Sequence, residues 1–306
     1  MSRQLNLNLR KSKKKYLFIG LGTMGYPMAG HLSKKNDFDL YVFNRSSKVT
    51  SKWLKQYKAF EFTPINSLDV KFDGLITCLK DDKAIIDVLI NKRLISRLKK
   101  NSFIIDHSTS SLDLIQLITS DYEVVDKGIS FFDAPISGGE SGAIHGVLSV
   151  MFGGPKNKSL VIQKLMESYA QSIVHIGPSG HGQLTKMVNQ LCIGGLIQGL
   201  SEGISLGKSS GLDMHRVFDA ISNGAAQSWQ MDNRFKTMIK DEFNFGFAVD
   251  LMIKDLNIAL NQSRISQLDL KISKEVLKNY KKLSKQGYGS LDTSSLIKIL
   301  GRTIND

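Results

Sequence analysis

Three glycines spaced as G-x-G-x-x-G constrain the fold of this chain more than any other feature. The motif is Gly20-Leu21-Gly22-Thr23-Met24-Gly25, and it lies between two apolar runs, Tyr16–Ile19 and Leu40–Phe43. In a strand-turn-helix unit the first glycine permits the sharp turn, the second lets the backbone approach a diphosphate, and the third lets the helix pack on the sheet. The spacing alone also fits an ordinary turn, but the flanking strands favour a dinucleotide-binding site formed by these six residues.

Further apolar runs alternate with helix-like segments through the first half of the chain. They are residues 74–79, 102–106, 129–134, 148–152 and 173–175. This alternation predicts an α/β fold with an N-terminal Rossmann-type, doubly wound and mostly parallel sheet that has helices on both faces. Because ligands bind beyond the carboxyl ends of such strands, we expect Thr23, Asn44, Leu79 and Thr109 to lie around one crevice.

The second half of the chain has a different pattern. Residues 182–208 contain no proline and no strand signal, which predicts one helix about 40 Å long at 1.5 Å per residue. Its glycines would let other helices approach closely, so we expect it to be buried between domains or subunits. Further helices should follow, giving an all-α C-terminal domain. We therefore divide the chain into a basic tail (1–13), a Rossmann domain (14–177) and a helical substrate and dimerisation domain (178–306).

The net charge of +13 is concentrated in two short segments. Residues 1–15 and 271–285 together account for eleven of the thirteen charges. Neither segment interleaves its lysines with aromatic residues that could stack on bases, so we expect solvated surfaces and no nucleic-acid partner. No apolar stretch reaches the roughly 18 residues of a membrane span, and no secretory signal is apparent, so a cytoplasmic protein is expected. Cys78 and Cys192 lack metal-ligand spacing and are expected to be buried thiols, with no metal site.

The end of the second strand bears on the choice of dinucleotide. An acid at this position usually binds the ribose hydroxyls of NAD, whereas an arginine accommodates the 2′-phosphate of NADP. Here the strand is followed by Asn44, Arg45 and Ser46, with no carboxylate. A solvated loop arginine is the alternative interpretation, but the position favours NADP over NAD.

Two later segments carry candidate chemistry. Ser137, Gly138 and Gly139 follow a strand and a proline, and their backbone could turn inwards to bind a substrate carboxylate, although a plain glycine-rich turn fits equally well. Lys186 lies with Asn189 and Gln190 on one face of the long helix. A desolvated lysine there would have a lowered pKa and could act as a general acid or base, whereas most lysines are simply solvated.

These motifs together resemble the β-hydroxyacid dehydrogenase family, over roughly residues 14–300. The similarity comprises the glycine-rich fingerprint, the block D-A-P-I-S-G-G-E-S-G-A at 133–143, the block G-H-G-Q-L-T-K-M-V-N-Q at 180–190, Asp106 to Thr109, and Lys254 to Leu256. The resemblance implies hydride transfer between a nicotinamide cofactor and a small hydroxyacid or semialdehyde, in a homodimer or homotetramer.

The resemblance also implies a role for each matching residue. Lys186 would be the catalytic acid/base, Asn189 would orient the substrate with Gln190, and Ser137 with the two glycines after it would bind the carboxylate. Cofactor contacts would come from Met24, Asn44, Arg45 and Ser46 at the adenosine end, from Thr109 and Lys254 at the nicotinamide end, and from the loop at Leu79.

Two departures from the family pattern keep alternatives open. The family commonly has Met-Leu-Pro where this chain has Cys78-Leu79-Lys80. Residues 226–247, which include Trp229 and Phe245, match no subfamily well enough to name a substrate, and Trp229 could equally pack in the core. An imine reductase on the same scaffold is one alternative, although such relatives usually lack the lysine. The other alternative is a non-catalytic dinucleotide-binding module that uses its basic tail to contact nucleic acid or a partner.

Overall fold

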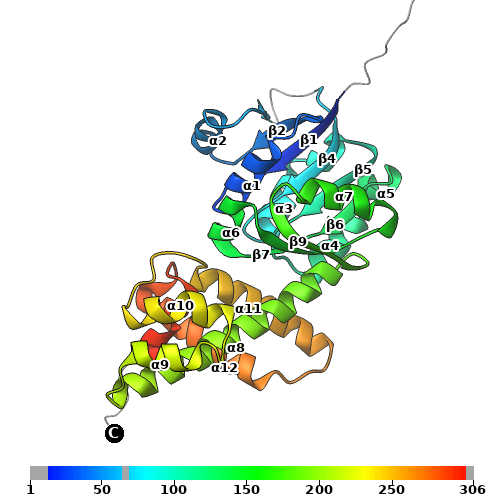
Figure 1. The fold of residues 1–306 in the computed structure, drawn as a ribbon. Coiled ribbons are helices and arrows are strands. Elements are labelled where there is room, and N and C mark those ends of the chain that lie inside the picture. Colours follow the sequence, from blue (N-terminus) through cyan, green and yellow to red (C-terminus); the bar gives the residue numbers. More distant parts are fainter. Residues whose placement is uncertain (1–12, 64–68, 301–306) are drawn as a thin grey trace, which may run out of the picture.

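The computed structural model describes residues 13–63 and 69–300. The predicted basic tail, apart from Lys13, lies outside the described residues. A sheet domain and a helical domain follow one another along the chain, and a long helix runs from the first into the second (Figure 1). The chain crosses between them after Gly177, where the last strand ends.

The described part of the N-terminal domain contains one nine-stranded sheet, in the order β3-β2-β1-β4-β5-β6-β8-β7, with β9 pairing with β8. The strands are β1 (Lys14–Ile19), β2 (Phe38–Phe43), β3 (Phe60–Glu61), β4 (Phe72–Thr77), β5 (Leu98–Asp106), β6 (Ser130–Asp133), β7 (Ile136–Ser137), β8 (Leu148–Gly153) and β9 (Ala170–Gly177). Strands β1 to β6 pair in parallel, whereas β8 runs antiparallel to β6 and β7. The predicted Rossmann-type sheet is confirmed. The two-residue strands β3 and β7 were not predicted, because so short a segment has no periodicity.

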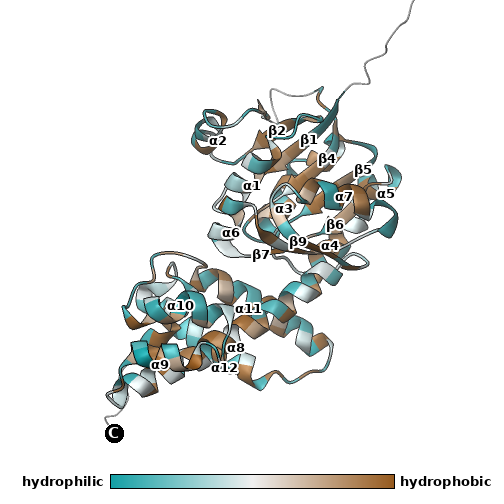
Figure 2. Ribbon diagram, in the orientation of Figure 1, coloured by the Kyte–Doolittle hydropathy of each residue, from teal (hydrophilic) through white to brown (hydrophobic). Residues whose placement is uncertain are grey.

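Helices cover both faces of this sheet. They are α1 (Gly25–Leu32), α2 (Ser47–Leu54), α3 (Asp82–Ile86), α4 (Leu112–Thr119), α5 (Tyr122–Asp126), α6 (Gly139–His145) and α7 (Ser159–Met166). Alternate residues of β1 feed two separate cores: Phe18 packs with α1 and α2, and Leu17 packs with α3 and α4. Figure 2 shows this apolar interior as brown strands behind mixed helices. Burial on both faces is what a central parallel strand requires.

The predicted long helix is α8 (His181–Ser209). Only one of its faces packs against the helices of its own domain. A Cβ at Gly194 would lie 3.3 Å from Val276, and one at Gly207 would lie 2.6 Å from the Met214 sulfur. At these two glycines the expected close approach of other helices is confirmed. Gly195, Gly199 and Gly203 have nothing within 4 Å of a Cβ, so no described residue of the same chain approaches them closely, and contact with another subunit stays a prediction at these positions.

In the described residues, four helices and one short helical turn pack around α8, and a second turn packs on α11 and α12. They are α9 (Met214–Ile221), α10 (Trp229–Ile239), α11 (Val249–Ile265) and α12 (Lys271–Leu283), with turns at Ser284–Tyr288 and Thr293–Ile299. All six lysines of residues 271–285 are exposed, as expected for a solvated face. In the described ranges, no helix is both long and apolar enough to cross a bilayer.

The expectation for the two cysteines needs correction. Cys78 is partly buried, and its burial together with the nearby Asp106 raises the pKa of its thiol to about 12. Cys192 is exposed, because it lies on the face of α8 that points away from the other helices. Apolar neighbours in the sequence did not predict this, since successive residues of a helix point in different directions.

Candidate functional site

The glycine-rich loop between β1 and α1 has the shape expected of a dinucleotide site. Gly20 has a φ of +98°, and a Cβ on it would lie 2.3 Å from the Cys78 carbonyl oxygen. A Cβ on Gly25 would lie 1.9 Å from the Gly20 carbonyl oxygen, whereas one on Gly22 would meet nothing within 4 Å. In the first turn of α1, the Tyr26 amide donates to the Gly22 carbonyl oxygen at 2.9 Å and Pro27 has no N–H, so the open space at Gly22 and the positive end of the helix dipole are what face a diphosphate. These residues therefore fit a dinucleotide.

The residues after β2 support this loop and flank it with a cation. The side-chain oxygen of Asn44 accepts a hydrogen bond from the backbone nitrogen of Leu21 at 3.1 Å. Its amide nitrogen donates to the Ser46 carbonyl at 3.3 Å. Arg45 is exposed, and among the described residues it forms no ion pair. Asn44 thus shapes the loop, while the guanidinium is available to an anion.

The ends of β4 and β5 are tied together by a buried carboxylate. Asp106 Oδ1 accepts hydrogen bonds from the hydroxyls of Thr77, at 2.8 Å, and Ser108, at 2.6 Å. The Ser108 hydroxyl oxygen in turn accepts from the backbone nitrogen of Leu79 at 2.9 Å. Burial raises the pKa of Asp106 to about 6, and these hydrogen bonds oppose the rise. The network fixes the loops that carry Leu79 and Thr109 next to each other.

His107, at the end of β5, takes no part in the crevice. Its Nδ1 lies 2.6 Å from the Ala134 carbonyl oxygen and its Nε2 lies 2.8 Å from the Tyr169 hydroxyl. Burial lowers the pKa of His107 to about 4, so the ring is neutral at pH 7. Through the Ala134 carbonyl, His107 anchors the end of β6, from which the chain leads into the next loop.

That loop contains the residues predicted to bind a carboxylate. Ser137 ends β7, and the next two residues, Gly138 and Gly139, have φ values of +124° and +62°. A Cβ on Gly139 would meet nothing within 4 Å. The positive φ values explain the glycines, because side chains disfavour this backbone conformation. The open face at Gly139 leaves the turn accessible.

Lys186 is held at this loop from the other domain. Its side chain is buried, with only 6% of the residue exposed, and Nζ donates to the Ile136 carbonyl oxygen at 2.9 Å. Burial lowers the pKa of Lys186 to about 8; the charge of Asp255 raises it and that of Lys254 lowers it further. An amine with a pKa this close to neutrality can donate or accept a proton at physiological pH.

A chain of polar contacts joins Lys186's neighbours to the cofactor-side loop. Asn189 Nδ2 donates to Gln190 Oε1 at 2.8 Å, and Gln190 Nε2 donates to Asp255 Oδ2 at 2.6 Å. Lys254 Nζ lies 3.1 Å from Asp255 Oδ1 and donates to the Thr109 carbonyl at 2.7 Å. Asp255 was not among the predicted site residues, although it belongs to a motif that resembles the family. The network brings the predicted substrate-side and cofactor-side residues together across the two domains.

Two family models together match almost all of the described chain. Residues 15–177 match the NAD binding domain of 6-phosphogluconate dehydrogenase, and residues 180–300 match the NAD-binding domain of NADP-dependent 3-hydroxyisobutyrate dehydrogenase. An Escherichia coli 2-hydroxy-3-oxopropionate reductase is 30% identical over 92% of this chain and 96% of its own length. The chain belongs to the β-hydroxyacid dehydrogenase family. It is accordingly an NAD(P)-dependent oxidoreductase of the 3-hydroxyisobutyrate dehydrogenase type, which acts on CH–OH groups of hydroxyacids.

One further relative agrees with this membership, and two solved structures show the same fold. An oxidoreductase of Shewanella frigidimarina is 40% identical over 92% of this chain and 97% of its own length. The solved structure of the Mycobacterium tuberculosis 3-hydroxyisobutyrate dehydrogenase with L-serine has a TM-score of 0.84 at 23% identity, covering 95% of this chain and all of that one. An imine reductase from Pseudomonas sp. is less similar, with a TM-score of 0.57 at 18% identity over 94% of this chain and all of that one. The solved structures share the fold.

The two aromatic residues of the segment that matches no subfamily pack against a cation of the helical domain. Trp229 and Phe245 flank the guanidinium of Arg234, whose carbon is 5.1 Å and 4.9 Å from the two ring centroids. Arg234 Nε also donates to the buried Asp292 at 3.0 Å. Trp229 is 54% exposed, so it is not a core residue.

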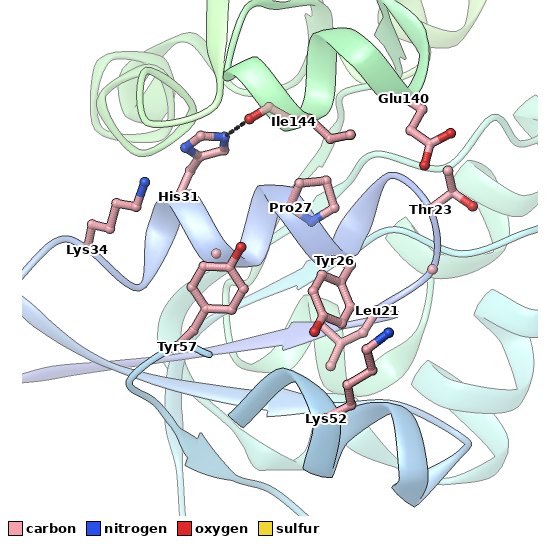
Figure 3. A pocket seen from close by; sticks show the side chains of 12 residues that line it. Leu21, Thr23, Tyr26, Pro27, His31, Lys34, Lys52, Tyr57, Glu140 and Ile144 are labelled. Carbon is pink, nitrogen blue, oxygen red and sulfur yellow. Dashed lines mark hydrogen bonds between the residues drawn. The ribbon is translucent and has the colours of Figure 1, made fainter. Parts of the chain in front are cut away.

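A cleft of about 510 Å³ runs along α1, and Leu21, Gly22 and Thr23 of the glycine-rich loop line it (Figure 3). Thr23 and Glu140 lie at one end, and Lys34 lies at the other. His31 reaches across to the Ile144 carbonyl oxygen at 3.0 Å. Lys186 does not line this cleft, so it is not where a family member would carry out its reaction.

Proposed function

We propose that this protein is an NADP-dependent reductase or dehydrogenase of a small β-hydroxyacid or its semialdehyde, with Lys186 as the general acid/base. One observation carries the proposal: a buried ammonium, with its pKa lowered by burial to about 8, is fixed at the start of β7 beside a glycine turn. A structural lysine gains nothing from such burial, because desolvating an ammonium costs free energy.

Lys186 would handle the proton that accompanies hydride transfer. When bound, the cofactor supplies or accepts hydride at nicotinamide C4. In the reductive direction the ammonium donates a proton to the forming alkoxide, and in the oxidative direction the amine removes the hydroxyl proton. The Ile136 carbonyl keeps Nζ pointing at the loop instead of into solvent.

The neighbouring groups would bind the rest of the substrate. Backbone amides of Ser137, Gly138 and Gly139, with the Ser137 hydroxyl, are proposed to bind a carboxylate, as anions bind to successive backbone N–H groups. Because Gln190 accepts one hydrogen of the Asn189 amide, the other hydrogen and the amide oxygen stay available. Asn189 is therefore proposed to orient the substrate oxygen, with Gln190 fixing its amide.

The cofactor preference is proposed from Arg45. Its planar guanidinium and the absence of a carboxylate after β2 support NADP over NAD, with Asn44 and Ser46 as neutral donors. A structural neighbour, described as Psf3, was solved in complex with NADP⁺. Lys254 and the Thr109 loop, which one hydrogen bond joins, are proposed for the nicotinamide end.

We also propose that two copies associate through α8, as a homodimer or within a homotetramer. One face of the helix carries small or apolar residues that no described part of the chain covers: Val188, Cys192, Gly195, Gly199, Gly203 and Leu206. Small residues there would let a second helix approach closely. Light scattering should give at least a dimer for the natural protein and a smaller species for Gly199→Glu. A monomeric natural protein would contradict the proposal.

The test of the enzymatic proposal is a paired cofactor and substrate screen. Purified protein would be assayed for oxidation of NADPH and NADH with glyoxylate, succinic semialdehyde, tartronate semialdehyde and methylmalonate semialdehyde. We expect turnover of at least one semialdehyde, faster with NADPH. Turnover of a cyclic imine but of no semialdehyde would favour the imine reductase alternative. Salt-dependent DNA binding without any turnover would favour the non-catalytic module.

A further inference from the structure

The carboxylate of Asp133 occupies the N-terminus of the helix that carries Lys186, yet the proposed chemistry does not use it. Asp133 Oδ1 accepts a hydrogen bond from the Gly180 amide at 2.7 Å, and Oδ2 accepts one from the Gln183 amide at 2.8 Å. Gly180, the N-cap residue of α8, has no side chain to offer. The first-turn amides of α8 are therefore capped by the end of β6, 47 and 50 residues earlier in the chain.

Two glycines make room for this contact. A Cβ on Gly182 would lie 2.9 Å from Asp133 Oδ2 and 2.4 Å from the Asp133 carbonyl oxygen. A Cβ on Gly153, in β8, would lie 2.8 Å from Asp133 Oδ1 and 2.4 Å from the Pro178 carbonyl oxygen. Side chains at either position would separate the helix from the strand, so the close approach of the Asp133 carboxylate depends on both glycines.

The same short segment also holds Lys186. Ile136, three residues after Asp133, accepts the hydrogen bond from Lys186 Nζ. Gln183 and Lys186 are three residues apart and so lie on one face of α8. The Gln183 side chain adds two further bonds, from the Ser110 amide at 3.1 Å and to the Ser108 carbonyl at 2.7 Å. Residues 133–136 thus contact α8 at two successive turns of one face.

We propose that Asp133 is a positioning residue that caps α8 and thereby keeps Lys186 buried against the Ile136 carbonyl. The proposal rests on the acid/base function proposed for Lys186. A carboxylate at a helix N-terminus satisfies unpaired amides and interacts favourably with the helix dipole. Without it the first turn of α8 frays, water reaches the ammonium, and Nζ loses its fixed direction.

A purely structural carboxylate would behave differently. It would change the stability of the protein but leave the pKa of Lys186 unchanged. The charged groups that face Lys186 from the packed elements are Asp255 and Lys254, both on α11, and both remain in an Asp133 variant. Loss of the Asp133 negative charge would by itself lower the pKa of Lys186, so a rise in that pKa on substitution of Asp133 reports the burial and position of the amine.

The test compares the full-length natural protein with Asp133→Asn. Asparagine has one side-chain oxygen for two amide donors, so one bond is lost. We expect kcat for reduction at pH 7 to fall roughly tenfold or more, with KM for NADPH within about twofold, because the glycine-rich loop is untouched. The alkaline limb of the pH profile should move upward from about 8, towards the ordinary lysine pKa.

A second readout needs no substrate. The rate at which acetic anhydride acetylates Lys186, followed by peptide mass spectrometry against pH, reports the pKa of the amine directly. We expect a higher pKa in Asp133→Asn than in the natural protein. This result would stand even if every semialdehyde failed as a substrate, so failure of the positioning role and failure of the proposed function are distinguishable.

The control is Asp121→Asn, which alters a carboxylate that caps α5 through the amides of Glu123 and Val124. It should leave both readouts unchanged. If Asp133→Asn does not fold, Gly182→Ala provides the second variant, because its Cβ would push α8 away from Asp133; the pKa of Lys186 should again rise. A lowered melting temperature with unchanged kcat and an unchanged Lys186 pKa would overturn the proposal.

Discussion

The glycine-rich loop and the Lys186 turn of α8 are both binding elements at the start of a helix, but they are built differently. The loop works through its backbone: Gly25 is required by a close contact within the loop, Gly20 by its positive φ and by the Cys78 carbonyl oxygen after β4, and Gly22 leaves open space. Lys186 works through a side chain whose pKa depends on burial by residues from both domains. A backbone site is encoded locally, whereas a reactive side chain acquires its property from tertiary packing.

The largest expected effect is on the side-chain site. Lys186→Met should lower kcat by about 10² to 10⁴-fold, the range typical of a lost general acid or base, with NADPH binding retained. Lys208→Met is the matched control, since Lys208 is on the same helix and also donates to a carbonyl, that of Ile239, but is exposed. Steady-state kinetics and fluorescence titration with NADPH would measure both. Equal turnover in the two variants would show that Lys186 is not the general acid/base.

Substitutions of two glycines in the glycine-rich loop should affect the stability of the fold and the binding of NADPH separately. Gly25→Ala forces a Cβ to 1.9 Å from the Gly20 carbonyl oxygen and should cost about 1 to 3 kcal/mol of unfolding free energy. Gly22→Ala meets no protein atom, so its stability should stay within about 1 kcal/mol of the natural protein while NADPH affinity falls by roughly 10 to 100-fold. Urea unfolding and NADPH titration would test this. Destabilisation by Gly22→Ala with normal NADPH affinity would contradict it.

Arg45 extends the comparison to a side chain in solvent. Arg45→Ala should weaken NADPH binding by about tenfold and leave NADH binding unchanged, because only NADPH presents a 2′-phosphate to the guanidinium. Titration of each dinucleotide into the natural protein and the variant gives the two ratios. Arg216→Ala removes another exposed arginine and should change neither. An equal loss of affinity for both dinucleotides would show that Arg45 does not recognise the 2′-phosphate.

The smallest effect is on the pH profile of the natural protein. The lowered pKa of about 8 means that Lys186 is protonated below pH 8 and neutral above it. Reduction requires the protonated amine, so its kcat should fall to half near pH 8; oxidation requires the neutral amine and should rise over the same interval. Profiles of both directions would measure this. If kcat for reduction instead fell to half near pH 10, burial would not lower the pKa of Lys186.

The sheet was predictable from sequence because alternating apolar runs and glycine spacing are local patterns. The face of α8 on which Lys186 lies with Asn189 and Gln190 was predictable for the same reason. Their partners were not: Asp255 comes from α11, and the Ile136 carbonyl that holds Lys186 is a backbone group without a sequence signature. Cys192 was misplaced because local hydrophobicity does not say which side of a helix finds a partner.

The sequence by itself determined the Rossmann-type sheet, the diphosphate loop, the long helix and the family, since each depends on residues close together in the chain. Only the tertiary structure decided that Lys186 is buried, that Asp133 caps its helix, and that Lys254 bonds to the Thr109 carbonyl of the other domain. These properties depend on desolvation and on contacts between distant segments. Backbone conformation is set by neighbours along the chain, whereas the pKa and direction of a side chain are set by neighbours in space.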